Sequence, residues 1–136
     1  MAATTGPRNT PAALGDMRKP PLPAAGKINQ GAMVQINAAG YAVPASATIA
    51  NVTIGRADEG VDNTAGANGD KSITVRRGVF RYANSAAGDL IARTEIGKTV
   101  YVVDDQTVAK TNNAGARPAA GICFDVDAQG VWVEFA

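Results

Sequence analysis

The 136-residue sequence has no histidine, a single cysteine and no long hydrophobic run. Without histidine, neither a Ser-His-Asp nor a Cys-His catalytic site can form, and no histidine can bind a metal. The lone thiol of Cys123 cannot form an internal disulfide, so the redox compartment stays open. No run of 18 apolar residues is present, and the N-terminus lacks the apolar segment of a signal peptide. We therefore expect a protein that is not an enzyme, uses no cofactor or metal and binds no membrane.

Charge and leucine are also scarce. The formal net charge of +1 gives no field strong enough for general nucleic-acid binding. Three leucines stand against 13 valines, 8 isoleucines and 15 glycines, a composition that favours strands joined by tight turns over helices. The sequence therefore predicts a mainly β protein, either a small β-barrel or a two-sheet sandwich, with an extended N-terminal arm.

Residues 1–26 differ from the rest because they hold five of the seven prolines. Proline removes backbone donors and favours an extended chain, so this segment is either a disordered tail or an arm that becomes ordered along a partner. Apolar side chains scattered among basic ones favour the second interpretation, with residues 27–136 forming the β domain. The predicted partner contacts of this arm are Arg8, Leu14, Met17, Arg18, Lys19 and Leu22.

Within the β domain, alternating apolar residues and turn signals predict a series of hairpins. The predicted elements are a hairpin of 33–36 with 41–43, a strand over 49–54, a loop over 58–70, a long strand over 72–82 with a bulge at Gly78, a helical turn within 85–93, and hairpins of 100–103 with 107–109 and of 121–126 with 131–135. An aromatic centre of the core is expected at Phe124, Trp132 and Phe135.

A possible internal repeat relates residues 31–57 to residues 97–123. The pattern Gly31-x-x-Val34-x-Ile36 returns as Gly97-x-x-Val100-x-Val102, and a second glycine, Gly55 or Gly121, follows each first glycine at the same spacing. The repeat predicts two similar β units. Because the identity is sparse, a chance similarity is the alternative.

The polar clusters of the sequence suggest no reaction. The pairs Asp104-Asp105 and Asp125-x-Asp127 and the loop Asp58-Glu59-x-x-Asp62 could face a cation, but none matches a calcium loop, and acids are common in turns. No glycine stretch has the spacing of a phosphate-binding loop. The basic group Arg76, Arg77 and Arg81 is expected to form an exposed or ion-pairing face, and Cys123, between apolar neighbours, to be a buried and inert thiol.

Several short segments, in this order, resemble small capsid decoration proteins of tailed bacteriophages. The segments are Gly31-x-x-Val34, Arg77-Gly-Val-Phe80 followed by Ala-Gly-Asp, Gly97-Lys-x-Val-Tyr101, Ala120-Gly-Ile-Cys123 and Gly130-Val-Trp-Val-Glu-Phe135. The resemblance covers roughly residues 27 to 136 and implies a compact β-barrel or sandwich. It carries no particular site residue, because binding in that family is spread over a surface.

The function that this resemblance implies is that of a head decoration, or cement, protein. Such a protein lies on the outer surface of the virion capsid, binds the major capsid protein and itself as a homodimer or homotrimer, and stabilises the shell without contacting nucleic acid. Another virion β module, in the tail or baseplate, is the first alternative. A small hydrolase or sugar-binding domain that uses Asp104, Asp125 or Asp127 is the second.

Overall fold

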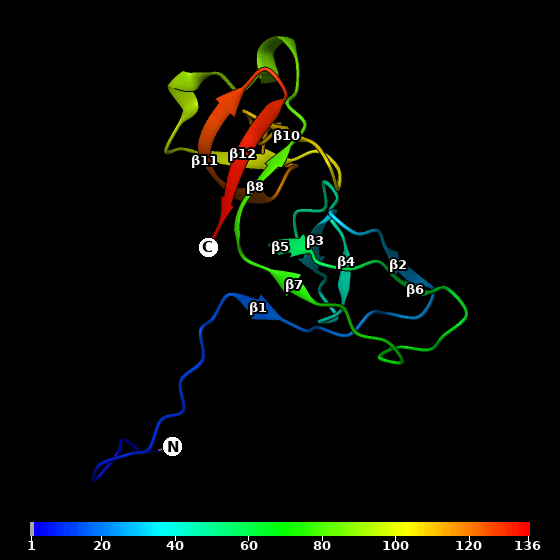
Figure 1. The fold of residues 1–136 in the computed structure, drawn as a ribbon, viewed down its shortest axis with the longest axis vertical. Coiled ribbons are helices and arrows are strands. Elements are labelled where there is room, and N and C mark those ends of the chain that lie inside the picture. The colour runs from blue at the N-terminus through cyan, green and yellow to red at the C-terminus, as the bar shows by residue number, and fades with distance from the viewer. Residues whose placement is uncertain (1) are drawn as a thin grey trace.

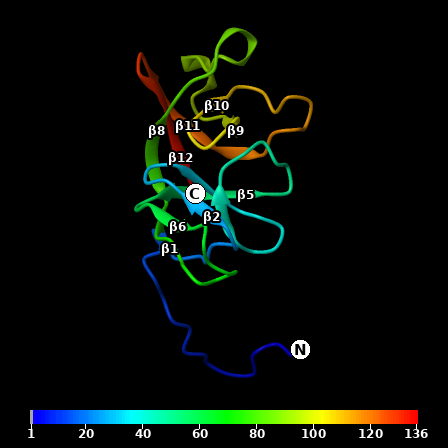
Figure 2. The same cartoon turned by 90° about the vertical axis from the view of Figure 1, so that its right-hand side faces the viewer.

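The computed structural model describes residues 2–136, and nearly all of its regular structure is antiparallel β-sheet. Two five-stranded sheets follow one another along the longest axis, and the N-terminal segment runs away from both (Figures 1 and 2). The first sheet has the order β1-β7-β5-β3-β4. Its strands are β1 (Met17–Arg18), β3 (Met33–Ile36), β4 (Ala42–Pro44), β5 (Val52–Ala57) and β7 (Val75–Arg76).

The second sheet has the order β10-β9-β11-β12-β8, and a separate two-stranded ribbon pairs β2 with β6. The strands of the second sheet are β8 (Gly78–Tyr82), β9 (Thr99–Val102), β10 (Val108–Ala109), β11 (Ala119–Asp127) and β12 (Gly130–Phe135). The remaining elements are β2 (Gly26–Ile28), β6 (Val61–Asn63) and two single 3-10 turns, η1 (Ala87–Asp89) and η2 (Arg93–Glu95). The predicted mainly β fold is confirmed in a sandwich-like form. The barrel alternative is wrong, because neither sheet closes on itself.

Each sheet covers its own buried cluster of side chains. The cluster of the first sheet includes Leu22, Ile28 and Ile73, and that of the second includes Ile91 and Val131. The two clusters are not independent, because two residues of the first half belong to the cluster of the second. These residues are Met33 and Ala45.

The two halves repeat the same backbone pairing at the spacing of the suspected repeat. In each half a bulge interrupts the pairing of the first hairpin strand with the longer strand, at Val34↔Gly55 and at Val100↔Gly121. Three backbone hydrogen bonds of the first half recur at the corresponding positions of the second. The bond from Gly31 N to Ala57 O corresponds to that from Gly97 N to Cys123 O. The bond from Ala57 N to Ala32 O corresponds to that from Cys123 N to Lys98 O, and the bond from Asn37 N to Tyr41 O corresponds to that from Val103 N to Thr107 O.

Gly55 and Gly121 have the same structural role in the two halves. A Cβ on Gly55 would collide with the carbonyl oxygen of Arg76, and one on Gly121 with that of Glu134. Gly55 also has a φ of +150°, which side chains rarely adopt. The two glycines therefore let the neighbouring strand approach closely. The shared contact also makes Arg76 of β7 the structural counterpart of Glu134 of β12.

The predicted hairpins of 33–36 with 41–43, 100–103 with 107–109 and 121–126 with 131–135 are confirmed, but the long strand over 72–82 is wrong. Its two ends, β7 and β8, belong to different sheets, and the chain crosses between the sheets at Arg77–Gly78. Gly78 permits this crossing because its φ is +145°. The predicted loop over 58–70 contains β6, and the predicted helical turn is only two 3-10 turns.

The predicted boundary of the arm at residue 26 is also wrong. Met17 and Arg18 pair with β7 at the edge of the first sheet, and Pro21 forms a bridge with Ser72. Leu22 is fully buried, and its backbone bonds to Lys71. The part of the arm that touches no strand is residues 2–15. It ends at Gly15, whose φ of +80° turns the chain away from the sheet.

Candidate functional site

The arm is the most exposed segment of the described chain. Every residue from 2 to 15 is exposed, and Leu14, the largest apolar side chain among them, is 96% exposed. Of the predicted arm contacts, five are exposed and one is not. The exposed ones are Arg8, Leu14, Met17, Arg18 and Lys19.

Leu22 is the predicted contact that the structure corrects. It is completely buried in the cluster of the first sheet, beside strands β2 and β7. Its burial removes apolar surface from water and stabilises the fold, so it is not available to a partner. Apolar character alone did not separate this core residue from the exposed Leu14 earlier in the chain.

Ion pairs fasten the root of the arm to the first sheet. Arg76 of β7 lies 3.2 Å from Asp16 and 3.0 Å from Asp58. Arg56 of β5 also pairs with Asp58 at 3.0 Å, and its guanidinium lies 5.2 Å from the centre of the Phe80 ring. The backbone N–H of Arg77 donates to the carbonyl of Asp16. The arm is therefore fixed at Asp16, whereas residues 2–15 before it are exposed along their whole length.

Asp62 and Asp104 act as turn formers. Asp104 accepts the backbone N–H of Gln106, and Asp62 accepts that of Thr64. The pKa of Asp62 is lowered, chiefly by the hydrogen bond with Thr64. Among residues 2–136 no three His, Cys, Asp or Glu side chains come together in a way that could hold a metal ion.

Asp127 closes the β11–β12 hairpin. It accepts the backbone N–H groups of Gln129 and Gly130 and the indole N–H of Trp132, the last at 2.9 Å. The hydrogen bond from Trp132 is the largest cause of its lowered pKa. These hydrogen bonds favour the ionised carboxylate, which in turn fixes the turn between β11 and β12 and the indole of Trp132.

The predicted basic group is not one patch. Arg76 lies in the ion-pair network, whereas Arg81 of β8 stacks over Trp132 at 5.5 Å and lies 4.0 Å from Asp127.

Cys123 is buried as predicted, and burial, followed by the charges of Asp125 and Glu95, raises the pKa of its thiol.

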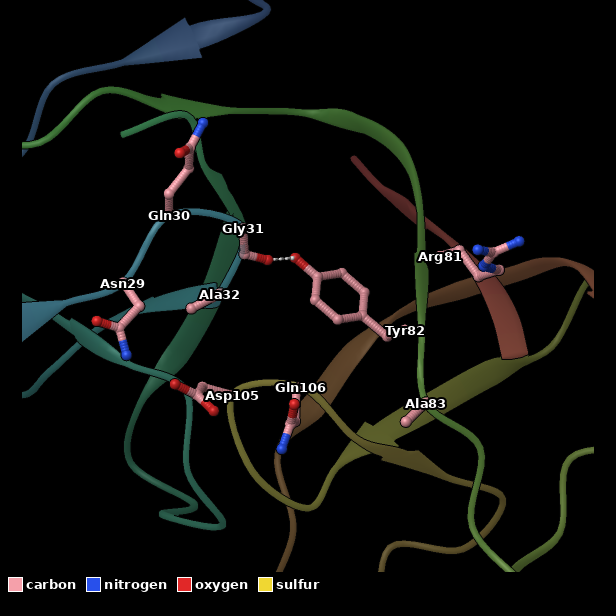
Figure 3. Close-up of a pocket in the computed structure, with 9 residues that line it drawn as sticks. All are labelled: Asn29, Gln30, Gly31, Ala32, Arg81, Tyr82, Ala83, Asp105 and Gln106. Carbon is pink, nitrogen blue, oxygen red and sulfur yellow. Dashed lines mark hydrogen bonds between the residues drawn. The ribbon is translucent and has the colours of Figure 1, made fainter. Parts of the chain in front are cut away.

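A polar cleft lies between the two sheets (Figure 3). Tyr82 enters it from β8 and donates its hydroxyl to the carbonyl of Gly31 at 2.8 Å. Burial raises the pKa of Tyr82, so this hydroxyl keeps its proton. The lining amides and carboxylate come from Asn29, Gln30, Asp105 and Gln106. No side chain that lines the cleft is a nucleophile paired with a base, and the hydrogen bond from Tyr82 to Gly31 crosses the cleft from one half to the other.

The outer surface of the second sheet carries two aromatic side chains, Phe124 and Trp132, that were predicted in the core. Phe124 was predicted in the core but is 58% exposed, because it follows the buried Cys123 and therefore points to the opposite, outer face of the strand. The bulge between Cys123 and Asp125 places Asp125 on that outer face as well. Trp132 is only half-buried, whereas Phe135 is buried as predicted. Strand alternation could identify both Phe124 and Trp132 as outward-facing, since each lies next to a buried residue of its strand.

Comparison with known proteins gives no relative. No family model matches the chain, and neither a curated protein nor a solved structure matches it significantly. Within the described part of the chain, no helix has the length and apolar character needed to cross a bilayer.

Proposed function

We propose that this chain is a head decoration protein of a tailed bacteriophage. It would bind the outer surface of the assembled major capsid shell and stabilise it by bridging neighbouring capsid subunits. The observation that carries the proposal is the arm: residues 2–15 are exposed and form no strand, yet the residues that follow them are fixed to the β body by strand pairing. This combination suits a protein that reaches across a surface, and no reaction is needed for it.

The physical chemistry of this role agrees with the arm. Fourteen extended residues reach about 43 Å at about 3.1 Å each, which is enough to pass from one protein subunit to the next. Ordering the arm costs conformational entropy, which anchoring contacts must offset. Many copies acting together make weak individual contacts sufficient. Arg8 supplies a charge for an acidic shell surface, and the other exposed side chains of the arm are available to the shell or to a neighbouring copy in the proposed homodimer or homotrimer.

The test is co-sedimentation with bare shells assembled from the major capsid protein of the phage that encodes this chain. The full chain is compared with one lacking residues 2–15, because the shorter deletion leaves β1 and Leu22 in place. We expect saturable binding of the full chain and loss of binding without the arm.

Point variants separate the arm contacts from a general change in surface. The variant with Arg8→Ala and Leu14→Ala is expected to bind less well than the full chain. Its matched control carries Arg93→Ala and Leu90→Ala, a similar exposed pair on the body. Equal binding by full and shortened chains would move the interface to the β body. Failure of both to bind would overturn the proposal, and labelling of intact particles would then test the tail or baseplate alternative.

A further inference from the structure

The outer face of the second sheet is an exposed apolar surface with an acidic border. Register places Ile122 beside Glu134 and Asp125 beside Trp132, so these side chains share one face. Ile122 is 38% exposed, and Phe124 projects between these two pairs. We name this surface the β11–β12 face; it consists of Ile122, Phe124, Asp125, Trp132 and Glu134.

The fold does not require apolar residues there, as the first half shows. The counterparts of Ile122, Phe124 and Glu134 in the first sheet form the ion-pair network of the arm root. They are Arg56, Asp58 and Arg76. The same backbone is therefore stable with charged side chains at these positions. Exposed aromatic residues on one of two equivalent surfaces are typical of a protein interface.

Charge indicates what covers this face. Asp125 and Glu134 form no ion pair within residues 2–136, whereas the nearby Arg81 is already engaged by Asp127 and Trp132. A partner should therefore present apolar groups together with positive charge. Two such faces would repel one another, because each carries the same unpaired acids.

The root of the arm has this composition. Leu14 and Met17 are exposed apolar residues, 96% and 52% exposed, and Arg18 and Lys19 follow them directly. Met17 contacts Arg76 of its own chain through its sulfur, at 3.3 Å, but is still half exposed. Leu14 is almost fully exposed, because the arm before β1 leads away from the body (Figure 1). We infer that residues 14–19 of one copy bind the β11–β12 face of a second copy, with Leu14 and Met17 against its apolar side chains and the two cations beside its acids.

The face also offers a recess for Leu14. A groove of about 460 Å³ opens beside Ile122 and Glu134 and is lined further along by Ile49 and Val52, which are 62% and 64% exposed. The only charged side chain of this groove is Glu134. The contact is head to tail, with different surfaces on the two copies, so repeated copies form a closed ring or an open chain. Residues 2–13, with Arg8, remain free for a shell. The inference therefore names the surfaces that would join copies in the proposed homo-oligomer, and it does not depend on binding to a shell.

The test is the mass of the full chain in solution without any shell, measured by sedimentation velocity over a range of concentrations. We expect reversible association that Phe124→Asp weakens at least tenfold and that Leu14→Asp weakens similarly. The matched control is Leu90→Asp, because Leu90 is 48% exposed and lies outside the face. Thermal unfolding of each variant shows whether it is still folded.

A charge exchange makes the test specific. Lys19→Glu and Glu134→Lys are each expected to weaken association, and the chain that carries both is expected to recover it. A protein that is monomeric at every concentration overturns the inference, as does association that the face variants leave unchanged. Loss of shell binding by Phe124→Asp in a monomeric protein would show that the shell covers this face. Because no shell is used in the association test, its failure is distinct from failure of the proposed function.

Discussion

The two halves of this chain have one backbone plan and two different surfaces. The bulge, the close approach at a glycine and three hydrogen bonds recur at corresponding positions of the two halves. On the outer surface, however, the first half holds a network of ion pairs where the second holds exposed apolar side chains. The recurring features are therefore those that the fold needs. The features that differ are those that the environment of each half determines.

The two halves should differ most in the free energy of unfolding that is lost on substitution of Met33 and of its counterpart in the second half, Thr99. Met33 is fully buried in the cluster of the second sheet, whereas Thr99 is exposed. Met33→Ala removes a buried side chain that joins the halves and is expected to lower the free energy of unfolding by about 3 kcal/mol. Thr99→Ala should change it by less than about 0.5 kcal/mol. Urea unfolding measures both, and equal effects would show that the halves do not pack in this way.

The close approach at Gly55 and Gly121 predicts matched losses in the two halves. An added methyl group must displace the backbone of β7 or of β12, so each change to alanine is expected to cost about 2 to 3 kcal/mol. Gly55→Ala should cost more, because Gly55 also has a positive φ. Gly88→Ala is the control, since no atom lies near its Cβ position. If either variant were as stable as this control, the equivalence of the two glycines would fail.

Gln35 holds the loop at Ser46 in the first half through two side-chain hydrogen bonds, and the residue at its position in the second half is Tyr101. Gln35 is completely buried, accepts the backbone N–H of Ser46 at 3.0 Å and donates to the carbonyl of Ser46 at 3.1 Å. Gln35→Leu leaves both groups without a partner and is expected to cost about 2 kcal/mol. Its counterpart Tyr101 is only half-buried, so Tyr101→Leu should cost less than half as much. Hydrogen exchange at Ser46 should rise in the first variant only.

The sequence predicted the parts of the fold that depend on local pattern. Alternation and turn residues identified three hairpins, and the spacing of glycines suggested a repeat with the same spacing at which backbone hydrogen bonds recur. The assignment of β7 and β8 to different sheets was missed, because the break at Gly78 also fits a bulge within one strand, and only tertiary packing decides which sheet each part joins.

The candidate surface was predicted less well than the fold. The exposed arm residues Leu14 and Met17 were identified from composition, but Leu22 has the same local character and is buried by strands distant in sequence. Phe124 was placed in the core as part of an aromatic centre with Trp132 and Phe135, although alternation from the buried Cys123 directs it to the outer face. Burial at a position such as Leu22 depends on contacts between segments far apart in the chain.

The smallest expected loss of stability comes from a change at Cys123, which tests whether the buried side chains of the two halves can replace one another. Cys123 occupies the position of Ala57, and both are buried. Cys123→Ala gives the second half the side chain of the first and removes one sulfur atom, so we expect a loss of about 1 kcal/mol in urea unfolding. The native thiol should react with a thiol reagent only as fast as the chain opens, because the buried sulfur is shielded from the reagent. A loss well above this value would mean that the second cluster is packed around the sulfur, so that the halves share a backbone but not an interchangeable core.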